Sequence, residues 1–321
     1  MTLFEATDTF LELKRSLGAK YAAEGRVLRA FGRAMGDIGL DEIQPEAVRA
    51  FCRGSGPPTL WLVRKHYALQ VFFKHLALRG LIATSPLPES PPRVPRPFRP
   101  RIFSRQELAR LLEATSILDS PARPLRKETY RTLLLVLYGA GLRPGEGLRL
   151  RVCDVDVDSR LLFVWDSKCF KSRIVPVGTA LGEALATYLR ARRTLPMPSG
   201  QMSFFFASPR GGGISLASLE AAWVRLREQA NVCNPPSARW QPRLQDLRHN
   251  FATHRLVAWY REGADVQARL PWLATYLGHV TLAGTQAYLS MTPELLAEAS
   301  QRFERYADIG DEGAMPCPSN I

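Results

Sequence analysis

Cysteine is sparse in this chain of 321 residues, and its spacing excludes two structural uses. The cysteines are odd in number and no two form a C-x-x-C pair, which argues against a disulfide framework and against a zinc site. They are Cys52, Cys153, Cys169, Cys233 and Cys317. We expect them to be reduced thiols of a cytosolic protein.

Long hydrophobic runs are also missing. No apolar stretch approaches the roughly 20 residues that are needed to cross a bilayer. The N-terminus lacks the basic and apolar regions of a signal peptide. We therefore expect no membrane partner and a place in the cytoplasm, at the bacterial nucleoid.

Acidic residues are outnumbered by basic ones. The chain has 30 Asp and Glu against 43 Lys and Arg, which gives a formal net charge of +13. Such a charge predicts a polyanionic partner, with nucleic acid ahead of a membrane surface. Hydrophobic residues make up 46% of the chain, which is enough for buried cores, and the length suggests two domains.

Residues 1–84 have the pattern of a helical domain, because apolar residues recur at spacings near three and four. The segment 60–81 resembles one long helix with a buried face and a cationic face. We predict that its basic residues Arg64, Lys65 and Lys74 bind DNA.

Residues 85–102 form a linker rich in proline, which removes backbone donors and favours extended geometry. Two interpretations are open: a plain spacer, or a basic strap that crosses DNA phosphates. The strap is favoured because arginines alternate with the prolines, namely Arg93, Arg96, Arg99 and Arg101.

Residues 103–307 are predicted to form a mostly helical second domain, with a flexible tail at 308–321. Ser104 and Glu107 have the spacing of a capping box at a helix start. We expect a hairpin of strands at 161–166 and 172–177, and helices at 128–138, 179–193, 215–231, 246–262, 270–278, 283–290 and 293–306. The predicted fold class is mainly α with a small β-sheet (α+β).

Three basic positions could hold a phosphate. Arg143 lies in a glycine-flanked turn, where it could present a planar fork to an anion or make a surface salt bridge with Glu146. Lys168 and Lys171 lie at the predicted hairpin, where a lysine could act as a general acid or simply be solvated. Arg248 lies near a helix start, where backbone N–H groups also favour an anion.

Histidines and a tyrosine follow these cations. His249 and His254 are five residues apart with no suitable carboxylate, so we predict no metal site and a structural role for at least one of them. Tyr288 follows His279 by nine residues. A tyrosine on a short helix is usually a core residue, but the preceding arginines and lysine favour a reactive role here.

In this order, the motifs resemble the tyrosine recombinases, the phage-type integrase family. The resemblance covers about residues 103–306. It rests on Gly141-Leu142-Arg143-x-x-Glu146, on Arg173-Ile174-Val175-Pro176, on the segment 246–254, and on Leu277-Gly278-His279 followed by Tyr288. It implies an integrase-type catalytic domain and a helical core-binding domain that together clamp double-stranded DNA.

The resemblance also implies a role for each residue. Tyr288 is similar to the nucleophile that forms a covalent 3′-phosphotyrosine, and Arg143 and Arg248 are similar to the arginines that hold the scissile phosphate. Two guanidiniums would neutralise the transition-state charge. The covalent link conserves the energy of the broken bond, so the scheme needs no ATP, metal or cofactor.

The remaining catalytic positions follow in the same way. Lys168 is similar to the hairpin lysine that protonates the leaving 5′-oxygen, with Lys171 beside it in support. His279 is similar to the histidine that bonds the phosphate, and Glu146 to the acidic residue that supports the first arginine. The family usually has histidine where this chain has Gln245. Glutamine can donate a hydrogen bond but cannot exchange a proton near pH 7, so we expect an active but slowed enzyme.

The resemblance further implies a homotetramer on paired DNA sites and a biological role for a mobile element, with integration, excision, transposition and dimer resolution all left open. Accessory DNA-bending or partner recombinase proteins are possible partners. The predicted helix 293–306 could dock on its own domain or, as we favour, on a neighbouring protomer. Three alternatives are open: a DNA-binding member that has lost catalysis, a topoisomerase-like enzyme, and, less favoured, a basic RNA-binding protein.

Overall fold

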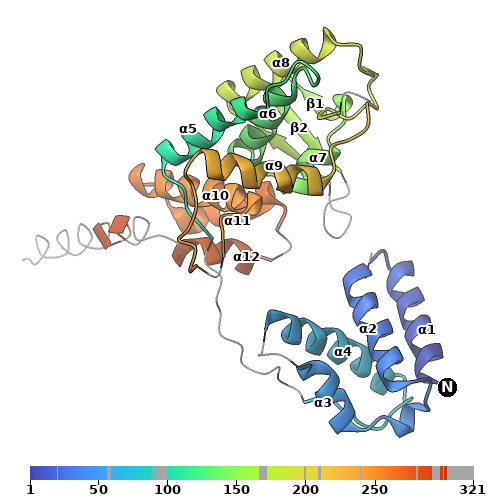
Figure 1. Cartoon of the computed structure of the whole chain (residues 1–321). Helices are drawn as coiled ribbons and strands as arrows, with labels where there is room; N and C mark the ends of the chain where they lie inside the picture. The colour runs from blue at the N-terminus through green and yellow to red at the C-terminus, as the bar shows by residue number, and fades with distance from the viewer. Residues whose placement is uncertain are drawn as a thin grey trace, which may run out of the picture. The chain divides into compact units, whose positions relative to one another are not determined.

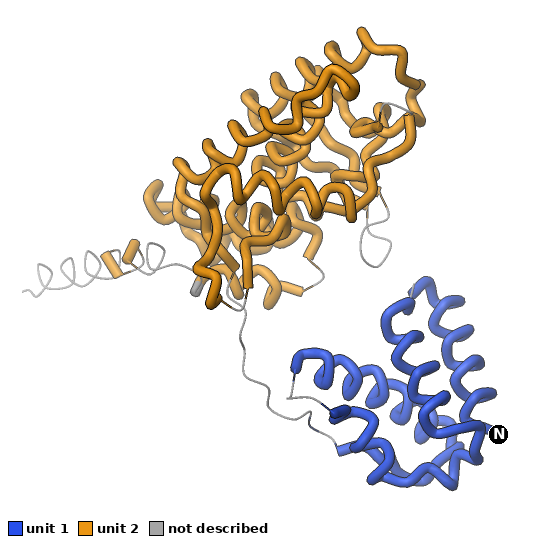
Figure 2. Tube along the Cα trace, viewed as in Figure 1, with its two compact units in different colours: residues 1–97 blue, residues 98–321 orange. Residues whose placement is uncertain are grey.

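The chain divides into two compact units, residues Met1–Pro97 and Phe98–Ile321 (Figure 2). This computed structural model describes residues 1–19, 21–55, 59–88, 90, 100–165, 172–198, 200–208, 211–238, 240–279, 281–290, 297–298 and 300–301. Several predictions lie outside these residues: the arginines Arg93, Arg96 and Arg99, the lysines Lys168 and Lys171, most of the helix 293–306 and the tail 308–321.

Unit 1 is helical, as the sequence predicts (Figure 1). A capping box between Thr2 and Glu5 starts the first helix. The helices are α1 (Leu3–Ser16), α2 (Ala22–Met35), the 3-10 turn η1 (Leu40–Glu42), α3 (Pro45–Arg53) and α4 (Leu60–Leu78).

Aromatic rings form the centre of unit 1. Phe10 of α1 meets Phe72 of α4 edge to face, and Phe31 of α2 meets Phe73 in the same way. Such edge-to-face pairs are favourable beyond the area they bury. Because α4 contributes two of the four rings, its opposite face is directed to solvent, and Arg64 and Lys74 are exposed there.

Unit 2 consists of packed helices and a small antiparallel sheet. The sheet has the order β1 (Val155–Asp156), β2 (Leu161–Val164), β3 (Arg173–Pro176), with Leu162 opposite Val175. The helices are α5 (Arg105–Glu113), η2 (Ala114–Leu118), α6 (Arg126–Gly139), α7 (Pro144–Arg149), η3 (Val152–Asp154), α8 (Thr179–Arg193), α9 (Leu216–Gln229), α10 (Leu244–Arg261), α11 (Val266–Leu277), α12 (Ala283–Gln286) and η5 (Ala287–Ser290).

The predicted α+β fold class is confirmed, with corrections to individual elements. Both predicted strands are shorter than expected, and the short strand β1 was not predicted. Helix α11 starts four residues before its predicted start, because the Asp265 side chain caps it by accepting the Ala268 N–H. The predicted helix 283–290 is two elements, and its second half is a 3-10 turn that carries Tyr288.

Two clusters of buried side chains hold unit 2 together. The larger one centres on α6, which packs against α8 and α10. The smaller one joins α10 to α11 and includes Tyr288 among its buried residues. The second cluster therefore fixes the position of the 3-10 turn relative to α10.

The start of unit 2 is tied to α10 by one buried amide. Asn250 is fully buried, and its Oδ1 accepts a hydrogen bond from the Phe103 N–H. Its Nδ2 donates to the carbonyls of Arg101 at 2.9 Å and Asp246 at 2.6 Å. Buried backbone groups need such partners, so this side chain sets where the segment 101–103 lies against α10.

We predict that Asn250→Ala lowers the free energy of unfolding by about 2 kcal/mol, because it leaves the buried Phe103 N–H without its acceptor. Urea denaturation followed by circular dichroism measures the change. Gln229→Ala is the matched control, because Gln229 is exposed and a surface change should stay within about 0.5 kcal/mol. Equal stabilities of the two variants would contradict the role of Asn250.

Candidate active site

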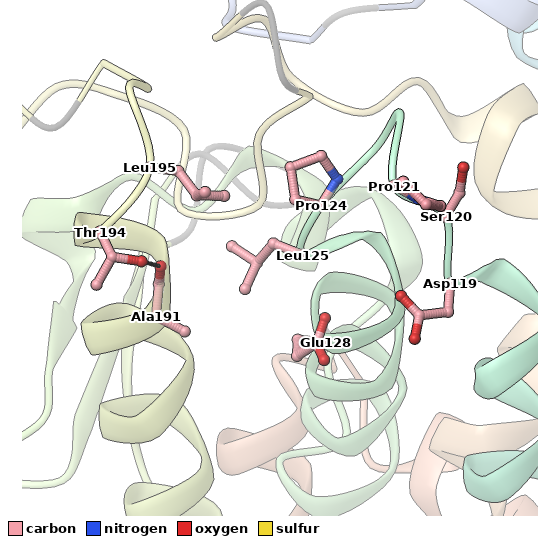
Figure 3. Close-up of a pocket in the computed structure, with 9 residues that line it drawn as sticks. All are labelled: Asp119, Ser120, Pro121, Pro124, Leu125, Glu128, Ala191, Thr194 and Leu195. Carbon is pink, nitrogen blue, oxygen red and sulfur yellow. Dashed lines mark hydrogen bonds between the residues drawn. The ribbon is translucent and has the colours of Figure 1, made fainter.

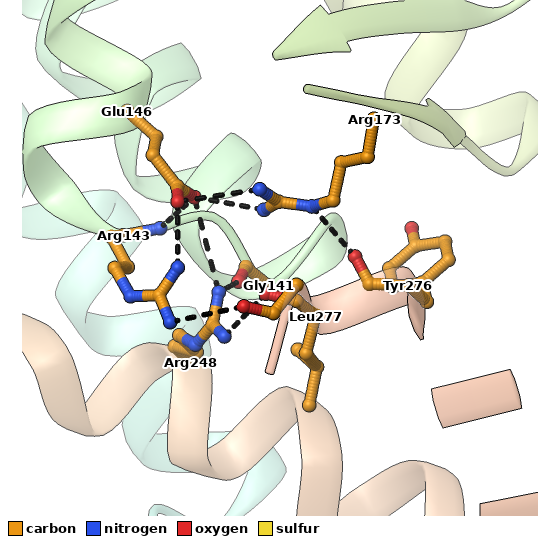
Figure 4. Close-up of polar contacts among 8 residues, drawn as sticks. Gly141, Arg143, Glu146, Arg173, Arg248, Tyr276 and Leu277 are labelled. Atoms are coloured by element: carbon orange, nitrogen blue, oxygen red, sulfur yellow. Dashed lines mark hydrogen bonds and ion pairs between the residues drawn. The ribbon is translucent and has the colours of Figure 1, made fainter. Parts of the chain in front are cut away.

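One buried carboxylate lies among three arginines that come from separate parts of unit 2 (Figure 4). The Glu146 side chain is only 2% exposed. Arg143 donates to its Oε1 at 2.7 Å from the start of α7, and Arg173 donates to its Oε2 at 2.8 Å from β3. Arg248 of α10 lies 3.9 Å from the same carboxylate. Positive charge is therefore left in excess at this site.

The end of helix α11 holds the same three arginines from the other side (Figure 4). Three consecutive carbonyls accept from them: Tyr276 from Arg173 at 2.9 Å, Leu277 from Arg248 at 2.6 Å, and Gly278 from Arg143 at 3.5 Å. The last carbonyls of a helix lack intrahelical partners and carry partial negative charge. Their hydrogen bonds with guanidinium groups are therefore favourable, and they orient each arginine.

The turn before Arg143 needs glycine. Gly141 has a φ of +61°, and a Cβ atom there would lie 2.6 Å from the ring of Phe251. Its carbonyl accepts from Arg248 Nη1 at 2.7 Å. The tight turn therefore brings the Arg143 backbone close enough to α10 for both arginines to face the same space.

The charges of the cluster are stabilised by its own members. Burial alone would raise the pKa of Glu146, but hydrogen bonds from Arg173 and Arg143 outweigh it and lower the pKa to about 2. Burial, together with the charge of Arg143, lowers the pKa of Arg248 to about 10. Both groups remain ionised near neutral pH, so the cluster stays cationic.

Tyr288 lies buried beside this cluster, with 3% of its surface exposed. Its ring is stacked on His279 at 6.0 Å and tilted against His249 at 5.5 Å between centroids. Burial raises the pKa of the phenol above its ordinary value, although Arg248 and Arg143 oppose the shift. The side chain is therefore a neutral phenol near pH 7.

His279 follows the left-handed cap of α11 at Gly278, which has a φ of +68°. Its Nδ1 lies 2.7 Å from Thr285 Oγ1. Burial and the charge of Arg248 lower its pKa to about 4. A neutral imidazole with one nitrogen tied to Thr285 has its other nitrogen left to meet a phosphate.

The remaining predicted site residues differ in how they lie relative to the arginine cluster. Gln245 lies in the first turn of α10, exposed, and makes no side-chain hydrogen bond within the described part of the chain. It lines a hollow that also contains Arg143, Glu146 and Arg243. Lys168 and Lys171 belong to the six residues between Trp165 and Ser172 that the structure does not describe.

Arg101 and His254 have structural partners. Arg101 donates to Asn234 at 2.8 Å and to Glu107 at 2.7 Å, so its guanidinium is already engaged within unit 2. His254 Nδ1 lies 3.1 Å from the Tyr138 hydroxyl. This contact fits the structural role expected for one histidine of the pair.

Sequence reasoning missed two residues of the site, Arg173 and His249. Arg173 was part of a motif but received no role. The two-residue period of a strand could have placed its side chain on the same face as the fully buried Val175. No local signal connects His249 to Tyr288, because their contact depends on how η5 packs on α10.

Two observations bear on cofactors and on other sites. Among the described residues, no group of three or more His, Cys, Asp or Glu side chains could hold a metal ion, and no described helix is long and apolar enough to span a membrane. A separate hollow between the α6 start and the α8 end presents Asp119 and Glu128 (Figure 3). Its carboxylates do not suit a phosphate, and it shares no lining residue with the arginine cluster.

Known proteins that are similar to this chain belong to one family. Residues 102–294 match the model of the phage integrase family. A protein of Sinorhizobium fredii named for an integrase/recombinase, y4rB, is 33% identical over 315 residues, covering 95% of this chain and 98% of its own length. The tyrosine recombinase XerC of Oceanobacillus iheyensis is 32% identical over 239 residues, covering 74% and 72%.

Solved structures share the fold. The integrase of transposon Tn1549, in a complex with transposon end DNA, has a TM-score of 0.67 at 16% identity and covers 96% of this chain and 100% of its own. A lambda integrase fragment bound to a core site has a TM-score of 0.60 at 18% identity, covering 88% and 97%. With the family model matching more than half of its residues, this chain belongs to the phage integrase family and is a tyrosine recombinase, an enzyme that cleaves and rejoins DNA at specific sites.

Proposed function

We propose that this enzyme cleaves a strand of duplex DNA by attack of Tyr288 on a phosphodiester, which forms a 3′-phosphotyrosine and releases a 5′-hydroxyl. The observation that carries the proposal is the position of a buried tyrosine beside a cationic cluster of three arginines. A phosphate that enters this space meets positive charge on one side and the phenol on the other. Rejoining reverses the step and needs no ATP.

Arg143 and Arg248 hold the scissile phosphate in this proposal. The Arg143 side chain is 26% exposed, so it can reach a ligand, whereas Arg248 is buried and held by two backbone carbonyls. Donors that are fixed before the reaction stabilise developing charge without reorganising. Arg173 acts differently, because all three nitrogens of its guanidinium are engaged, Nε by the Tyr276 carbonyl and both Nη atoms by Glu146. We assign it to holding Glu146.

The remaining roles follow the family resemblance. Lys168 protonates the 5′-oxygen, with Lys171 in support, and His279 bonds a non-bridging oxygen. Gln245 lies at the rim of the hollow next to Arg143, where its amide can donate to the same phosphate. No group at this position exchanges a proton, so Gln245 is assigned to binding.

DNA binding by unit 1 is assigned to one face of α4. Arg64 and Lys74 are exposed, and they share that face with the exposed rings of Trp61 and Tyr67. Basic residues interleaved with aromatic ones suit a nucleic acid, because phosphates and bases meet different side chains. Lys65 is less available, because its Nζ donates to the Phe51 carbonyl at 2.8 Å and lies 4.5 Å from the Phe51 ring centroid.

The assembly and its context remain proposals. We propose a homotetramer on paired sites, supported by similarity in fold to lambda integrase, whose tetramer has been solved on a Holliday junction. A role in a mobile element is supported by the fold shared with the Tn1549 transposon integrase and by the integrase/recombinase name of y4rB. The arginines of residues 93–99 would add phosphate contacts, and accessory proteins are further candidates for binding partners.

Tyr288→Phe should abolish the covalent protein–DNA adduct and leave DNA binding within about threefold, because it removes only the nucleophilic oxygen. The assay uses a nicked suicide duplex that carries a site selected from randomised DNA by binding, with adducts resolved in denaturing gels. Tyr260→Phe, on α10, is the control and should still form the adduct. An adduct that persists in Tyr288→Phe would remove Tyr288 as the nucleophile. An adduct without exchanged flanks on two-site substrates would favour the topoisomerase-like alternative.

Glu146→Gln should slow cleavage by about 10- to 100-fold, because the guanidiniums of Arg143 and Arg173 lose their shared anchor. It should also destabilise the fold in a pH-dependent way. The depressed pKa of Glu146, about 2, means that its carboxylate stabilises the native state above about pH 4.5, and this contribution is lost as the pH falls towards 2.

The stability difference between wild type and Glu146→Gln should therefore be largest near neutral pH and shrink in acid. Urea denaturation at a series of pH values measures it. Glu183→Gln on α8 is the control, because Glu183 is exposed. A difference that is independent of pH would argue that Glu146 acts through packing and not through its charge.

DNA binding should weaken steeply with salt, since Lys and Arg contacts to phosphate release counterions. Arg64→Ala and Lys74→Ala should each reduce the slope of log K against log salt by about one. Lys65→Ala should change the slope less and lower the melting temperature of unit 1 more, because Lys65 is engaged with Phe51. Fluorescence anisotropy on a duplex site measures the slopes, and a nearly flat response of wild type would contradict this DNA-binding surface.

A further inference from the structure

The proposed attack leaves one proton without an acceptor. Tyr288 must lose its phenolic proton as its oxygen bonds to phosphorus, and burial raises the pKa of that phenol. With 3% of its surface exposed, Tyr288 has little access to bulk water. A protein side chain close to Tyr288 must therefore take the proton.

Two histidine rings contact Tyr288, and they differ in what their nitrogens already do. His279 Nδ1 is tied to Thr285 at 2.7 Å. His249 Nδ1 is buried and has no hydrogen-bond partner within the described part of the chain. A buried polar atom without a partner is uncommon and calls for an explanation. Gln245, which stands where the family usually has histidine, is exposed and cannot take up a proton.

The surroundings of the His249 ring suit a side chain that takes up a proton for part of the reaction. It follows Arg248 directly on α10, and its ring centroid lies 5.5 Å from that of Tyr288 at an angle of 56°. The charged and titratable groups around it are Arg243 and Arg248 on its own helix, His279 at the end of α11, and Tyr288 on η5. No carboxylate is among the groups that shift the pKa of His249, and the Asp246 carboxylate, one turn earlier on α10, is engaged by Arg243.

We propose that His249 is the general base of the cleavage step and accepts the proton of Tyr288. This inference rests on the function proposed above. The O–H bond of Tyr288 breaks and the proton moves to the free nitrogen of His249. The Tyr288 oxygen bonds to phosphorus, the bond from phosphorus to the 5′-oxygen breaks, and Lys168 supplies a proton to that oxygen. On rejoining, His249 returns the proton to Tyr288.

The lowered pKa of His249 is consistent with a base that becomes effective when DNA binds. Burial and the charges of Arg243 and Arg248 lower the pKa of His249 to about 4, so the free ring is neutral and able to accept a proton. A bound phosphate would offset the charge of Arg248 and raise that pKa towards the range in which a base is effective. The base would then be strongest when the substrate is in place.

His249→Asn tests the proposal, because asparagine keeps a polar atom near the position of Nδ1 but cannot take up a proton. Its single-turnover rate of adduct formation on the nicked substrate should fall by about 100-fold. The rate of wild type should fall in acid as His249 becomes protonated, and the rate of the variant should lose this dependence. His249→Phe, which keeps a ring against Tyr288, should show the same loss if the Asn variant folds poorly.

A substrate with sulfur in place of the bridging 5′-oxygen separates the base from the acid, because a thiolate leaves without a proton. It should restore cleavage to Lys168→Ala and leave His249→Asn slow. His254→Asn is the matched control on α10 and should cleave at the wild-type rate, since His254 contacts Tyr138.

Each outcome decides between the proposals. Wild-type rates in both His249 variants, or full rescue of His249→Asn by the sulfur substrate, would overturn the role of His249 while leaving Tyr288 as nucleophile. If wild type itself forms no adduct, the proposed function fails and this inference fails with it.

Discussion

The site depends on a single buried carboxylate that holds several guanidiniums in place. Three arginines would repel one another in a space largely closed to water, and Glu146 with the carbonyls at the end of α11 offsets that repulsion. The compensation is incomplete, because the carbonyls carry only partial charge. The apoprotein therefore keeps a cationic space that a phosphate can complete, and the bound anion would relieve the remaining repulsion.

This arrangement makes the site a property of the whole of unit 2. Arg143 comes from the turn before α7, Arg173 from β3 and Arg248 from α10, while their acceptors lie at the end of α11 (Figure 4). The sharp turn at Gly141 allows two of these segments to meet. A change in the packing of α10 against α11 would therefore move Arg248, the carbonyls at the end of α11 and Tyr288 together, since one cluster of apolar side chains joins these segments.

Local patterns in the sequence were sufficient for most of the fold. The capping box at Ser104 marked the start of α5, and the predicted helices 60–81, 179–193 and 215–231 agree closely with α4, α8 and α9. Local patterns failed where a tertiary contact decides the outcome. The 3-10 turn of Tyr288 is set by its packing on α10, and the short β1 is a strand only because β2 lies beside it.

The site shows the same division. Arg143, Glu146, Arg248, His279 and Tyr288 were identified from motif order, and the structure brings them together. Arg173 could have been found from strand periodicity, because it lies two residues from the buried Val175 and so on the same, inward face of β3. His249 could not have been found in this way, because its position next to Arg248 in the sequence does not indicate that its ring contacts Tyr288. Spatial proximity across elements is information that one sequence does not carry.

The consequence of having Gln245 in place of histidine depends on whether phosphate binding or proton transfer is considered. Holding the phosphate depends on guanidiniums fixed by Glu146 and by backbone carbonyls, and none of these contacts involves residue 245. Proton transfer from the buried phenol of Tyr288 is a separate requirement. It needs a basic nitrogen that lies close to Tyr288 and has no other hydrogen-bond partner. Because the His249 ring contacts Tyr288 and its Nδ1 is buried without a partner in the described part of the chain, losing a proton-exchanging group at position 245 still leaves a candidate base at the site. Phosphate binding by the arginines and proton transfer from Tyr288 therefore depend on different residues. A glutamine at position 245 is compatible with an active recombinase.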